Sequence, residues 1–215
     1  MKYFVFDTET TGVYPDDEVV QFSGLLFDEN QELLDVVNFY CNSSKLMPKE
    51  AENVHGLNNK ILNELSKGLF FEDKIEQYPW LYNPKGIIFI GYNVSFDIRM
   101  VNNTLRLAGY ETIDFGQEVP RVPKFIKEED KDKNYNLCLM NTLKVNLQLP
   151  ARAKLEHLCK KYIDETPEDI SLLRKSLIEY YKLDDNPYNV HGFHDALFDS
   201  IATVSLFKKF ARFYL

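Results

Sequence analysis

Residues 2–12, KYFVFDTETTG, decide the fold, because a buried strand here runs directly into a pair of acidic side chains. After Lys2, residues 3–6 are all aromatic or β-branched, a composition typical of a strand. We expect the strand to end at Asp7 and a loop to follow, since a glycine and a proline come next. Alternate side chains of a strand share one face, so Asp7 and Glu9 should project together, with Thr8 on the opposite face.

This pair of acids has two interpretations. Two like charges on one face of a strand repel each other unless a cation lies between them. The alternative is a strand edge that finishes in two solvated acids. The pattern D-x-E alone does not decide between the two.

The order of apolar and polar stretches predicts an α/β domain, a mixed sheet flanked by helices. Residues 18–28 and 32–41 are strand-like and joined by a short turn, which favours an antiparallel pair. The apolar residues 86–90 predict a central strand covered on both faces. Apolar side chains at helical spacing predict helices over residues 48–65 (broken at His55 and Gly56), 70–82, 95–108, 137–147, 151–162, 167–183 and 195–214.

The composition is that of one globular domain over residues 1–215, since a domain holds roughly 100–200 residues. Apolar residues make up 45% of the chain and aromatic residues 14%, which excludes a disordered protein. No apolar stretch approaches the roughly 20 residues that cross a bilayer, and the first apolar run meets an acid too early for a secretory signal. Three cysteines without CxxC spacing favour free thiols in a reducing compartment, so we expect a cytoplasmic protein that does not bind membranes.

The negative charge is concentrated at one end of the chain. The net charge is −8, and residues 1–35 hold nine acidic residues against one basic residue. A protein that binds a long duplex through its phosphates would be basic. Either nucleic acid is not the ligand, or it is held over a short stretch with metal cations supplying the positive charge. We expect the acids of residues 16–18 and 28–32 to lie in solvated turns.

Two further acidic clusters lie at the ends of predicted elements. Asp97 follows the strand 86–90 in the first turn of a helix, where an acid also favours the positive end of the helix dipole. His194 and Asp199 open the last helix, in the sequence HDALFD. Five residues at about 100° each would place these two side chains about 140° apart, so they converge only if His194 lies in a turn before the helix.

Together the three clusters place four acids and one imidazole at the ends of strands and helices, where α/β sheets assemble their sites. Hard oxygen ligands favour Mg²⁺ or Mn²⁺, and the sequence has no cysteine–histidine grouping of the kind that binds structural zinc. Two such ions about 3.5–4 Å apart promote in-line phosphoryl displacement. An imidazole with a pKa near about 6.5 is then a suitable general base for the attacking water.

FDTETTG, GYNVSFD and HDALFD, in this order, resemble the three exonuclease motifs of the DEDDh 3′→5′ exonuclease superfamily. The likeness is to the epsilon proofreading subunit of bacterial DNA polymerase III and its stand-alone relatives. It extends from residue 2 to about residue 208 and includes residues 47–57, MPKEAENVHGL, and residues 155–162, LEHLCKKY.

The resemblance implies a ribonuclease H-like fold with a five-stranded mixed sheet. It implies that His194 is the general base and that two divalent ions, Mg²⁺ or Mn²⁺, are held by four acids, namely Asp7, Glu9, Asp97 and Asp199. The implied reaction releases nucleoside monophosphates from single-stranded 3′ ends.

The resemblance also implies a place for the terminal nucleotide. Family members bind it just after the first motif, which makes candidates of Thr10, Thr11 and Gly12. Further candidates for the same pocket are Tyr92, Asn93 and Phe96, where an aromatic ring could stack on a base, although packing is the commoner role for such rings. His55 also has a family counterpart, and we expect it to have a structural role in a turn.

Three features depart from the family pattern. The chain stops at Leu215, without the tail by which the proofreading subunit binds its polymerase, so we expect no polymerase tether. Residues 163–190 form a helical insert before the third motif that is longer than a minimal member needs. Residues 116–136 are polar, with proline and a run of mixed charge, and predict an exposed loop. The roles of both segments and the oligomeric state stay open.

Other classes of function fit parts of the sequence. FVFDTET also resembles the start of haloacid dehalogenase-type phosphatases, with Asp7 as the nucleophile and Asp195 and Asp199 as a late acidic pair. That interpretation leaves Asp97 and His194 unexplained. A binding module on the same fold would be favoured by the loss of a ligand, yet all five positions are filled.

The choice between DNA and RNA stays open at this point. A 3′→5′ exoribonuclease of the same family is the main alternative, since discrimination of the 2′-hydroxyl depends on details of the pocket. We favour single-stranded DNA, and with it a role in DNA repair or proofreading, because the first two motifs look more like the proofreading branch than like oligoribonuclease.

Overall fold

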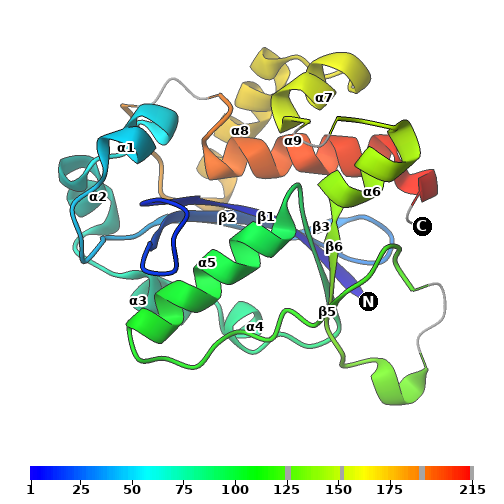
Figure 1. Cartoon of the computed structure of the whole chain (residues 1–215), viewed down its shortest axis with the longest axis horizontal. Helices are drawn as coiled ribbons and strands as arrows, with labels where there is room; N and C mark the ends of the chain where they lie inside the picture. Colours follow the sequence, from blue (N-terminus) through cyan, green and yellow to red (C-terminus); the bar gives the residue numbers. More distant parts are fainter. Residues whose placement is uncertain (124–126, 151–152, 189–191, 214–215) are drawn as a thin grey trace.

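One mixed sheet forms the centre of the molecule, and the computed structural model describes residues 1–123, 127–150, 153–188 and 192–213 (Figure 1). In these residues its strands are β1 (Lys2–Thr10), β2 (Val19–Phe27), β3 (Leu33–Tyr40), β4 (Ile87–Gly91), β5 (Gln117–Glu118) and β6 (Tyr135–Cys138). Their spatial order is β3-β2-β1-β4-β6-β5. β2 runs antiparallel to β1 and β3, as predicted, whereas β4 runs parallel to β1 and β6 parallel to β4.

The sheet has six strands in the described residues, so the prediction of five was wrong by one short edge strand. Gln117 and Glu118 pair with β6 as β5, inside the segment 116–136 that the sequence predicts as a loop. The side chain of Asn136 donates to Gly116 O at 2.9 Å and attaches the start of this segment to the sheet. Two residues are too few to show the alternation by which a sequence reveals a strand.

The helices of the described residues surround this sheet. They are α1 (Lys49–His55), α2 (Asn59–Ser66), α3 (Phe71–Ile75), α4 (Pro79–Tyr82), α5 (Val94–Leu107), α6 (Leu139–Leu147), α7 (Leu155–Tyr162), α8 (Pro167–Tyr181) and α9 (Ala196–Lys209), with the 3-10 turns η1 (Glu128–Asp130) and η2 (Ala211–Phe213). None of the described helices combines the length and the apolar character that crossing a bilayer requires.

Several boundaries have clear local causes. The predicted break at His55 and Gly56 is confirmed, because Gly56 ends α1 with a φ of 75°, in the left-handed region. The helix predicted over residues 70–82 is two short helices, since Pro79 has no N–H to continue a helix but suits the first turn of α4. The helix predicted from residue 137 begins two residues later, because the end of β6 pairs with β4.

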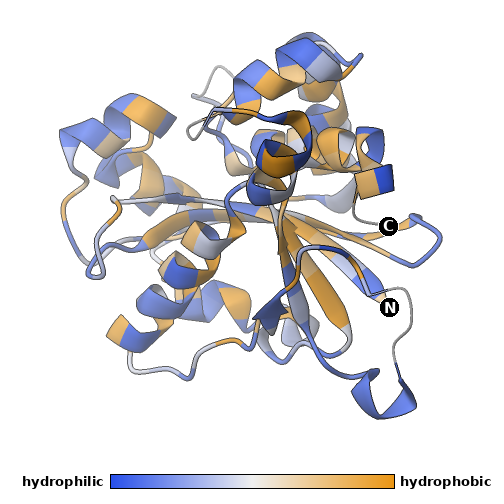
Figure 2. Ribbon diagram, turned by 45° about the vertical axis from the view of Figure 1, so that its right-hand side comes forward, coloured by the Kyte–Doolittle hydropathy of each residue, from blue (hydrophilic) through white to orange (hydrophobic). Residues whose placement is uncertain are grey.

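Two helices cover opposite faces of the sheet and position its central strand. α9 packs over β1 and β2 on one face, and α5 packs on the other (Figure 1). Val5 of β1 belongs to the same core as Leu197 of α9, whereas Phe4 and Phe6 belong to the core that contains Met100 of α5. Figure 2 shows long hydrophobic stretches in the strands between these helices. The side chains of β1 therefore alternate between the α9 face and the α5 face up to the end of the strand.

Candidate active site

A cavity of about 320 Å³ lies where β1 and β4 end and where α5 and α9 begin. All five residues that the three sequence motifs single out line it, namely Asp7, Glu9, Asp97, His194 and Asp199. They are separated by up to 192 positions in the chain, and only the fold brings them together. Neighbouring parallel strands end at one edge of a sheet, which is where such folds place their sites.

Asp7 and Glu9 stand on the α9 face of β1, as the strand alternation predicts. In the antiparallel register they lie opposite Ser23 and Gln21 of β2. Glu9 is buried, and the pairing becomes irregular directly after it, between Glu9 and Thr10. The cavity therefore begins where the regular sheet ends.

Asp97 connects α5 to the end of β1. Its Oδ1 accepts hydrogen bonds from the backbone N–H and the hydroxyl of Thr8, at 3.1 and 2.8 Å. The side chain is 3% exposed, so favouring the positive end of the helix does not by itself explain it. Thr8, on the face opposite Asp7 and Glu9, thus holds the third acid beside the first two.

His194 lies in a turn before α9, as the convergence argument requires. Its φ of 72° is in the left-handed region, which a residue other than glycine rarely adopts. Its backbone N–H donates to Asp199 Oδ2 at 3.1 Å. Asp195 caps the helix by accepting from Phe198 N at 3.0 Å. The turn and the cap place the imidazole beside the carboxylate five residues later.

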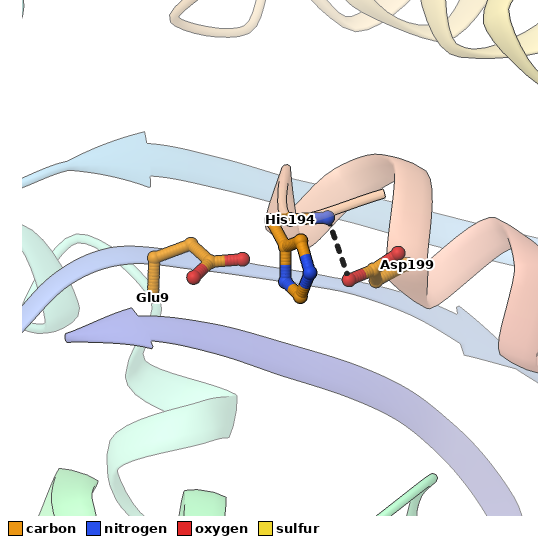
Figure 3. A group of neighbouring side chains, drawn as sticks. All are labelled: Glu9, His194 and Asp199. Atoms are coloured by element: carbon orange, nitrogen blue, oxygen red, sulfur yellow. Dashed lines mark hydrogen bonds between the residues drawn. The ribbon is translucent and has the colours of Figure 1, made fainter. Parts of the chain in front are cut away.

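Glu9, His194 and Asp199 form a group that could hold a cation (Figure 3). One ligand atom of each lies within 4.8 Å of those of the other two. Asp199 Oδ1 is buried and has no hydrogen-bond partner within the described part of the chain. A buried carboxylate oxygen without a partner is costly, and a bound divalent cation would satisfy it.

The pKa values of the four acids also indicate a cation site. Burial raises the pKa of Asp97 to about 7, and burial together with neighbouring carboxylates raises the pKa of Asp199 to about 8. Burial, followed by the charges of the other acids, raises the pKa of Asp7 and of Glu9 well above the usual range. Within the described residues no Lys or Arg forms an ion pair with any of the four. Their accumulated negative charge fits a site for metal cations.

The candidate substrate residues divide between two cavities. Tyr92, Asn93 and Phe96 line the cavity of the acids. Thr11 and Gly12 instead line a neighbouring cavity of about 610 Å³. Thr10 lines neither of these cavities, and its hydroxyl donates to Gly12 O at 2.6 Å. Their role in binding the terminal nucleotide stays a prediction.

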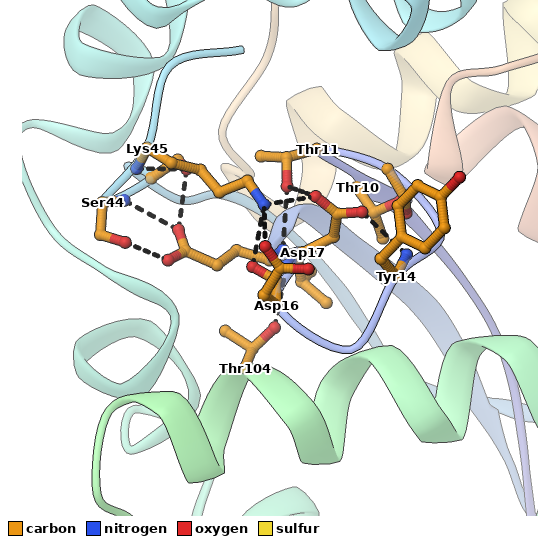
Figure 4. A network of polar contacts seen from close by, with 12 residues as sticks. Thr10, Thr11, Tyr14, Asp16, Asp17, Ser44, Lys45 and Thr104 are labelled. Carbon is orange, nitrogen blue, oxygen red and sulfur yellow. Dashed lines mark hydrogen bonds and ion pairs between the residues drawn. The ribbon is translucent and has the colours of Figure 1, made fainter. Parts of the chain in front are cut away.

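A polar network fixes the loop that carries Thr11 and Gly12 (Figure 4). Asp17 accepts from the Thr11 hydroxyl at 3.0 Å and from Tyr14 N at 2.8 Å, and it pairs with Lys45 at 2.6 Å. A Cβ added to Gly12 would lie 2.3 Å from Asp17 Oδ2, so a larger residue cannot take its place without displacing the network.

The expectation that the acids of residues 16–18 are solvated was wrong for two of them. Asp17 and Glu18 are 3% and 8% exposed. Glu18 accepts from the Ser43 hydroxyl at 2.7 Å and from Ser44 N at 2.8 Å. The two partners of Glu18 lie 25 and 26 positions away in the chain, and Lys45, the charged partner of Asp17, lies 28 positions away, so local turn chemistry does not reveal them.

Five residues of the cavity lining were not among the candidates from the sequence, namely Thr8, Lys154, Leu155, Glu156 and Phe193. Lys154 lines it and is the only Lys or Arg that the described residues contribute to its lining. Phe193 lines it directly before His194. Lys154 directly precedes the stretch LEHLCKKY, which is part of the family resemblance. This position was the signal in the sequence that could have indicated a place in the site.

The comparisons with known proteins identify the family. The model of the RNase_T family, described as exonuclease, matches residues 4–168. The chain belongs to this exonuclease family, and the resemblance predicted from the three motifs is confirmed. The match ends two residues into α8, so it contains the first two motifs and not the third.

Two curated proteins are similar to about half of the chain. The 3′-5′ exonuclease DinG of Bacillus subtilis (strain 168) is 28% identical over 115 residues, which is 53% of this chain and 12% of DinG. The DNA polymerase III PolC-type of Ureaplasma parvum serovar 3 is 24% identical over 117 residues, 52% of this chain and 8% of that protein. The matched part is thus a small fraction of each relative's length.

Solved structures of E. coli exonuclease I share the fold over nearly the whole chain. The complex with a dA16 oligonucleotide superposes with a TM-score of 0.61 at 19% identity, over 99% of this chain and 42% of that one. The zinc-bound complex with single-stranded DNA gives a TM-score of 0.61 over 99% and 41%. The predicted ribonuclease H-like fold is confirmed, and the likeness includes α9 with the third motif.

Proposed function

We propose that this chain is a 3′→5′ exonuclease that releases nucleoside monophosphates from the ends of single-stranded DNA. The observation that carries the proposal is the convergence of Asp7, Glu9, Asp97, His194 and Asp199 in one cavity from three distant segments. Family membership supports the reaction class. DinG is named as a 3′-5′ exonuclease, which supports the direction of digestion.

Asp7, Glu9, Asp97 and Asp199 would hold two divalent ions, Mg²⁺ or Mn²⁺. The donors are all carboxylates, the type that hard cations prefer, and the unpartnered Oδ1 of Asp199 supports a cation among them. When bound, two such ions supply an activated water and stabilise the charge on the leaving oxygen. A bound cation would also offset the repulsion that raises the pKa of these acids.

His194 would act as the general base. Burial lowers the pKa of its imidazole below the usual 6.5, so the ring is neutral at pH 7 and able to accept a proton. It is the exposed member of the group with Glu9 and Asp199, on the side that a water can reach. Its nitrogen is also near enough to these carboxylates to ligate a metal, and the pH dependence of the variant separates the two roles.

The substrate would be bound through its terminal nucleotides. Lys154 can contact a phosphate, and the rings of Tyr92 and Phe96 offer surfaces for base stacking. Thr10 at the end of β1, and Thr11 and Gly12 in the loop that follows, would contact the terminal nucleotide. Two of the exonuclease I structures are complexes with the DNA oligonucleotides dA16 and dT13, which favours DNA as the substrate here. A cytoplasmic location and a role in DNA repair or proofreading belong to the same proposal.

The test compares 5′-labelled single-stranded DNA and RNA of the same sequence, with Mg²⁺ or Mn²⁺ and with EDTA. We expect a ladder that shortens from the 3′ end of the DNA, mononucleotide release, and no reaction in EDTA. A phosphorothioate at the last 3′ linkage should block the ladder. Faster digestion of RNA would favour the exoribonuclease, and release of inorganic phosphate from small esters would favour a phosphatase.

A further inference from the structure

α8 sends one deeply buried charged side chain to the start of α9. Arg174 is 1% exposed and is among the largest fully buried side chains of the described chain. Its Nε donates to Asp195 Oδ1 at 2.8 Å and its Nη2 to Asp195 Oδ2 at 2.9 Å. This is the bidentate fork that arginine makes with a carboxylate, and it fixes direction as well as distance. A third bond joins Nη1 to Asp185 Oδ1 at 3.0 Å.

Asp195 lies directly between this arginine and the candidate active site. It follows His194 in the chain and caps α9 through its bond with Phe198 N. Gln21, which pairs with Glu9 in the sheet, accepts from Ala196 N at 3.2 Å. The first turn of α9 is thus held on one side by β2 and on the other by Arg174 through Asp195.

The positive charge of Arg174 balances the negative charge of the buried Asp195 carboxylate. Asp195 is 1% exposed, and its negative charge contributes to raising the pKa of Glu9, Asp7 and Asp199. Without Arg174 it would be a fifth buried carboxylate beside four that already repel each other, with no cationic partner and only neutral donors, namely Phe198 N at 3.0 Å, Gln21 Nε2 at 3.4 Å and the Tyr40 hydroxyl at 3.5 Å. A buried charge without its partner is strongly destabilising, so the turn would have to rearrange.

The backbone of His194 is sensitive to such a rearrangement. A left-handed φ of 72° at a non-glycine residue persists only when its surroundings hold it. The bond from His194 N to Asp199 Oδ2 and the fixed side chain of Asp195 are the two restraints next to it. Movement of Asp195 would displace both the imidazole and the Asp199 carboxylate.

We infer that Arg174 is a positioning residue for His194 and Asp199, and this inference rests on the proposed exonuclease function. It acts through Asp195, which it holds by a bidentate pair, and it does not itself contact the substrate. The helix α8, which lies in the segment whose role the sequence left open, thereby takes part in building the site. The family match ends at residue 168, so Arg174 lies outside it.

The alternative is that Arg174 only fastens α8 to the rest of the protein. Lys74 provides a control, because it forms a part-buried ion pair with Asp184 at 2.8 Å, in which 7% of the Lys74 side chain and 27% of the Asp184 side chain are exposed. Asp184 is adjacent to Asp185 in the chain. Lys74 lies in α3 and has no bond to α9, so Lys74→Met tests the loss of a part-buried ion pair without the loss of the bidentate fork.

The experiment compares Arg174→Met, Arg174→Lys, Lys74→Met and the double variant Arg174→Met/Asp195→Asn. For Arg174→Met we expect kcat on single-stranded DNA to fall roughly 10–100-fold with KM nearly unchanged, the effect typical of residues that orient catalytic ligands. Arg174→Lys should recover only part of kcat, because lysine keeps the charge without the fork. Lys74→Met should leave kcat unchanged. The double variant should regain unfolding temperature without regaining kcat.

Hydrogen exchange of the Phe198 and Asp199 amides gives a readout that does not depend on activity. We expect faster exchange of both in Arg174→Met and wild-type rates in Lys74→Met. Equal exchange in Arg174→Met and the wild type would overturn the inference, as would a double variant whose kcat recovers together with its stability. An inactive wild type with the expected exchange pattern would instead refute the proposed function and leave the anchoring of α9 intact.

Discussion

The backbone N–H of His194 donates to Asp199 Oδ2 at 3.1 Å, which fixes the two residues of the third motif to each other across the first turn of α9. On a continuous helix the two side chains would point about 140° apart. The left-handed turn at His194 removes this difference. The other oxygen of Asp199 is left buried and unpartnered among the described residues.

Asp7→Ala and Asp97→Ala should each abolish Mg²⁺-dependent digestion of single-stranded DNA while the fold stays intact. Loss of a residue that only orients a metal ligand typically lowers metal affinity or activity roughly 10–100-fold. Loss of a direct metal ligand should cost more, so we expect kcat/KM to fall more than about 100-fold. The measurement is kcat/KM together with the circular dichroism spectrum. Asp35→Ala, an acid of β3 outside this cavity, is the control. Full activity in either Asp7→Ala or Asp97→Ala would contradict the assignment.

His194→Ala should lose most activity and keep its affinity for Mn²⁺. Because burial places the pKa of His194 below 6.5, wild-type kcat should rise with pH through that region and then level off. This rise should be missing from the residual activity of the variant. A variant with the wild-type pH profile would rule out the general base, and one that loses Mn²⁺ affinity would make His194 a metal ligand.

The metal-free protein should lose stability as the pH rises from about 4 to about 8. The pKa of Asp97 is raised from 3.8 to about 7 and that of Asp199 from 3.8 to about 8. Acids with a raised pKa stabilise the folded state below the unfolded value and lose this contribution as the pH rises through the folded value. Thermal unfolding in EDTA at pH 5.5 and 8.5 measures this loss of stability. Each kcal/mol lost from the free energy of unfolding should lower Tm by about 2–4 °C.

Asp199→Asn should make the stability of the metal-free protein less dependent on pH, because the amide cannot be deprotonated. In the wild type, Mg²⁺ should raise Tm most at the higher pH. A wild-type protein that becomes more stable between pH 5.5 and 8.5 in EDTA would show that the buried acids are not the dominant titrating groups.

Lys154→Ala should weaken substrate binding with little effect on kcat. Each phosphate contact on a single strand contributes about 0.7 to the slope of log affinity against log salt, so the variant's slope should be shallower by about that amount. Lys161→Ala, in the helix α7 that Lys154 directly precedes but outside the cavity lining, is the control. Identical salt slopes for the wild type and Lys154→Ala would show that this lysine does not contact the substrate.

The sequence predicted the parts of the site that depend on short-range patterns. The strand that carries Asp7, the helix that carries Asp97 and the turn at His194 each have a local signature of periodicity or of a helix start. The predicted end of the first strand at Asp7 was wrong by three residues, because β1 continues to Thr10 by pairing with β2. The edge strand β5 has none, because it is two residues long. The transition from β6 to α6 was misplaced because one short apolar run serves both elements.

The supporting contacts depend on the tertiary fold and were out of reach of the sequence. Arg174 looks like any charged residue of an amphipathic helix until α8 buries it against Asp195. The burial of Asp17 depends on Lys45, which is 28 positions away. Pairings of this kind leave no periodic signal in a single sequence, so residues that orient the site are harder to find than those of the motifs.

The most direct test of the central claim, that four distant carboxylates hold metal in one cavity, is the anomalous diffraction of crystals grown with Mn²⁺ and a nucleoside monophosphate. We predict two manganese peaks in the cavity, bound by carboxylates from among Asp7, Glu9, Asp97 and Asp199, with the imidazole of His194 facing a metal-bound water. Manganese bound only outside this cavity, with the four carboxylates unliganded, would contradict the account.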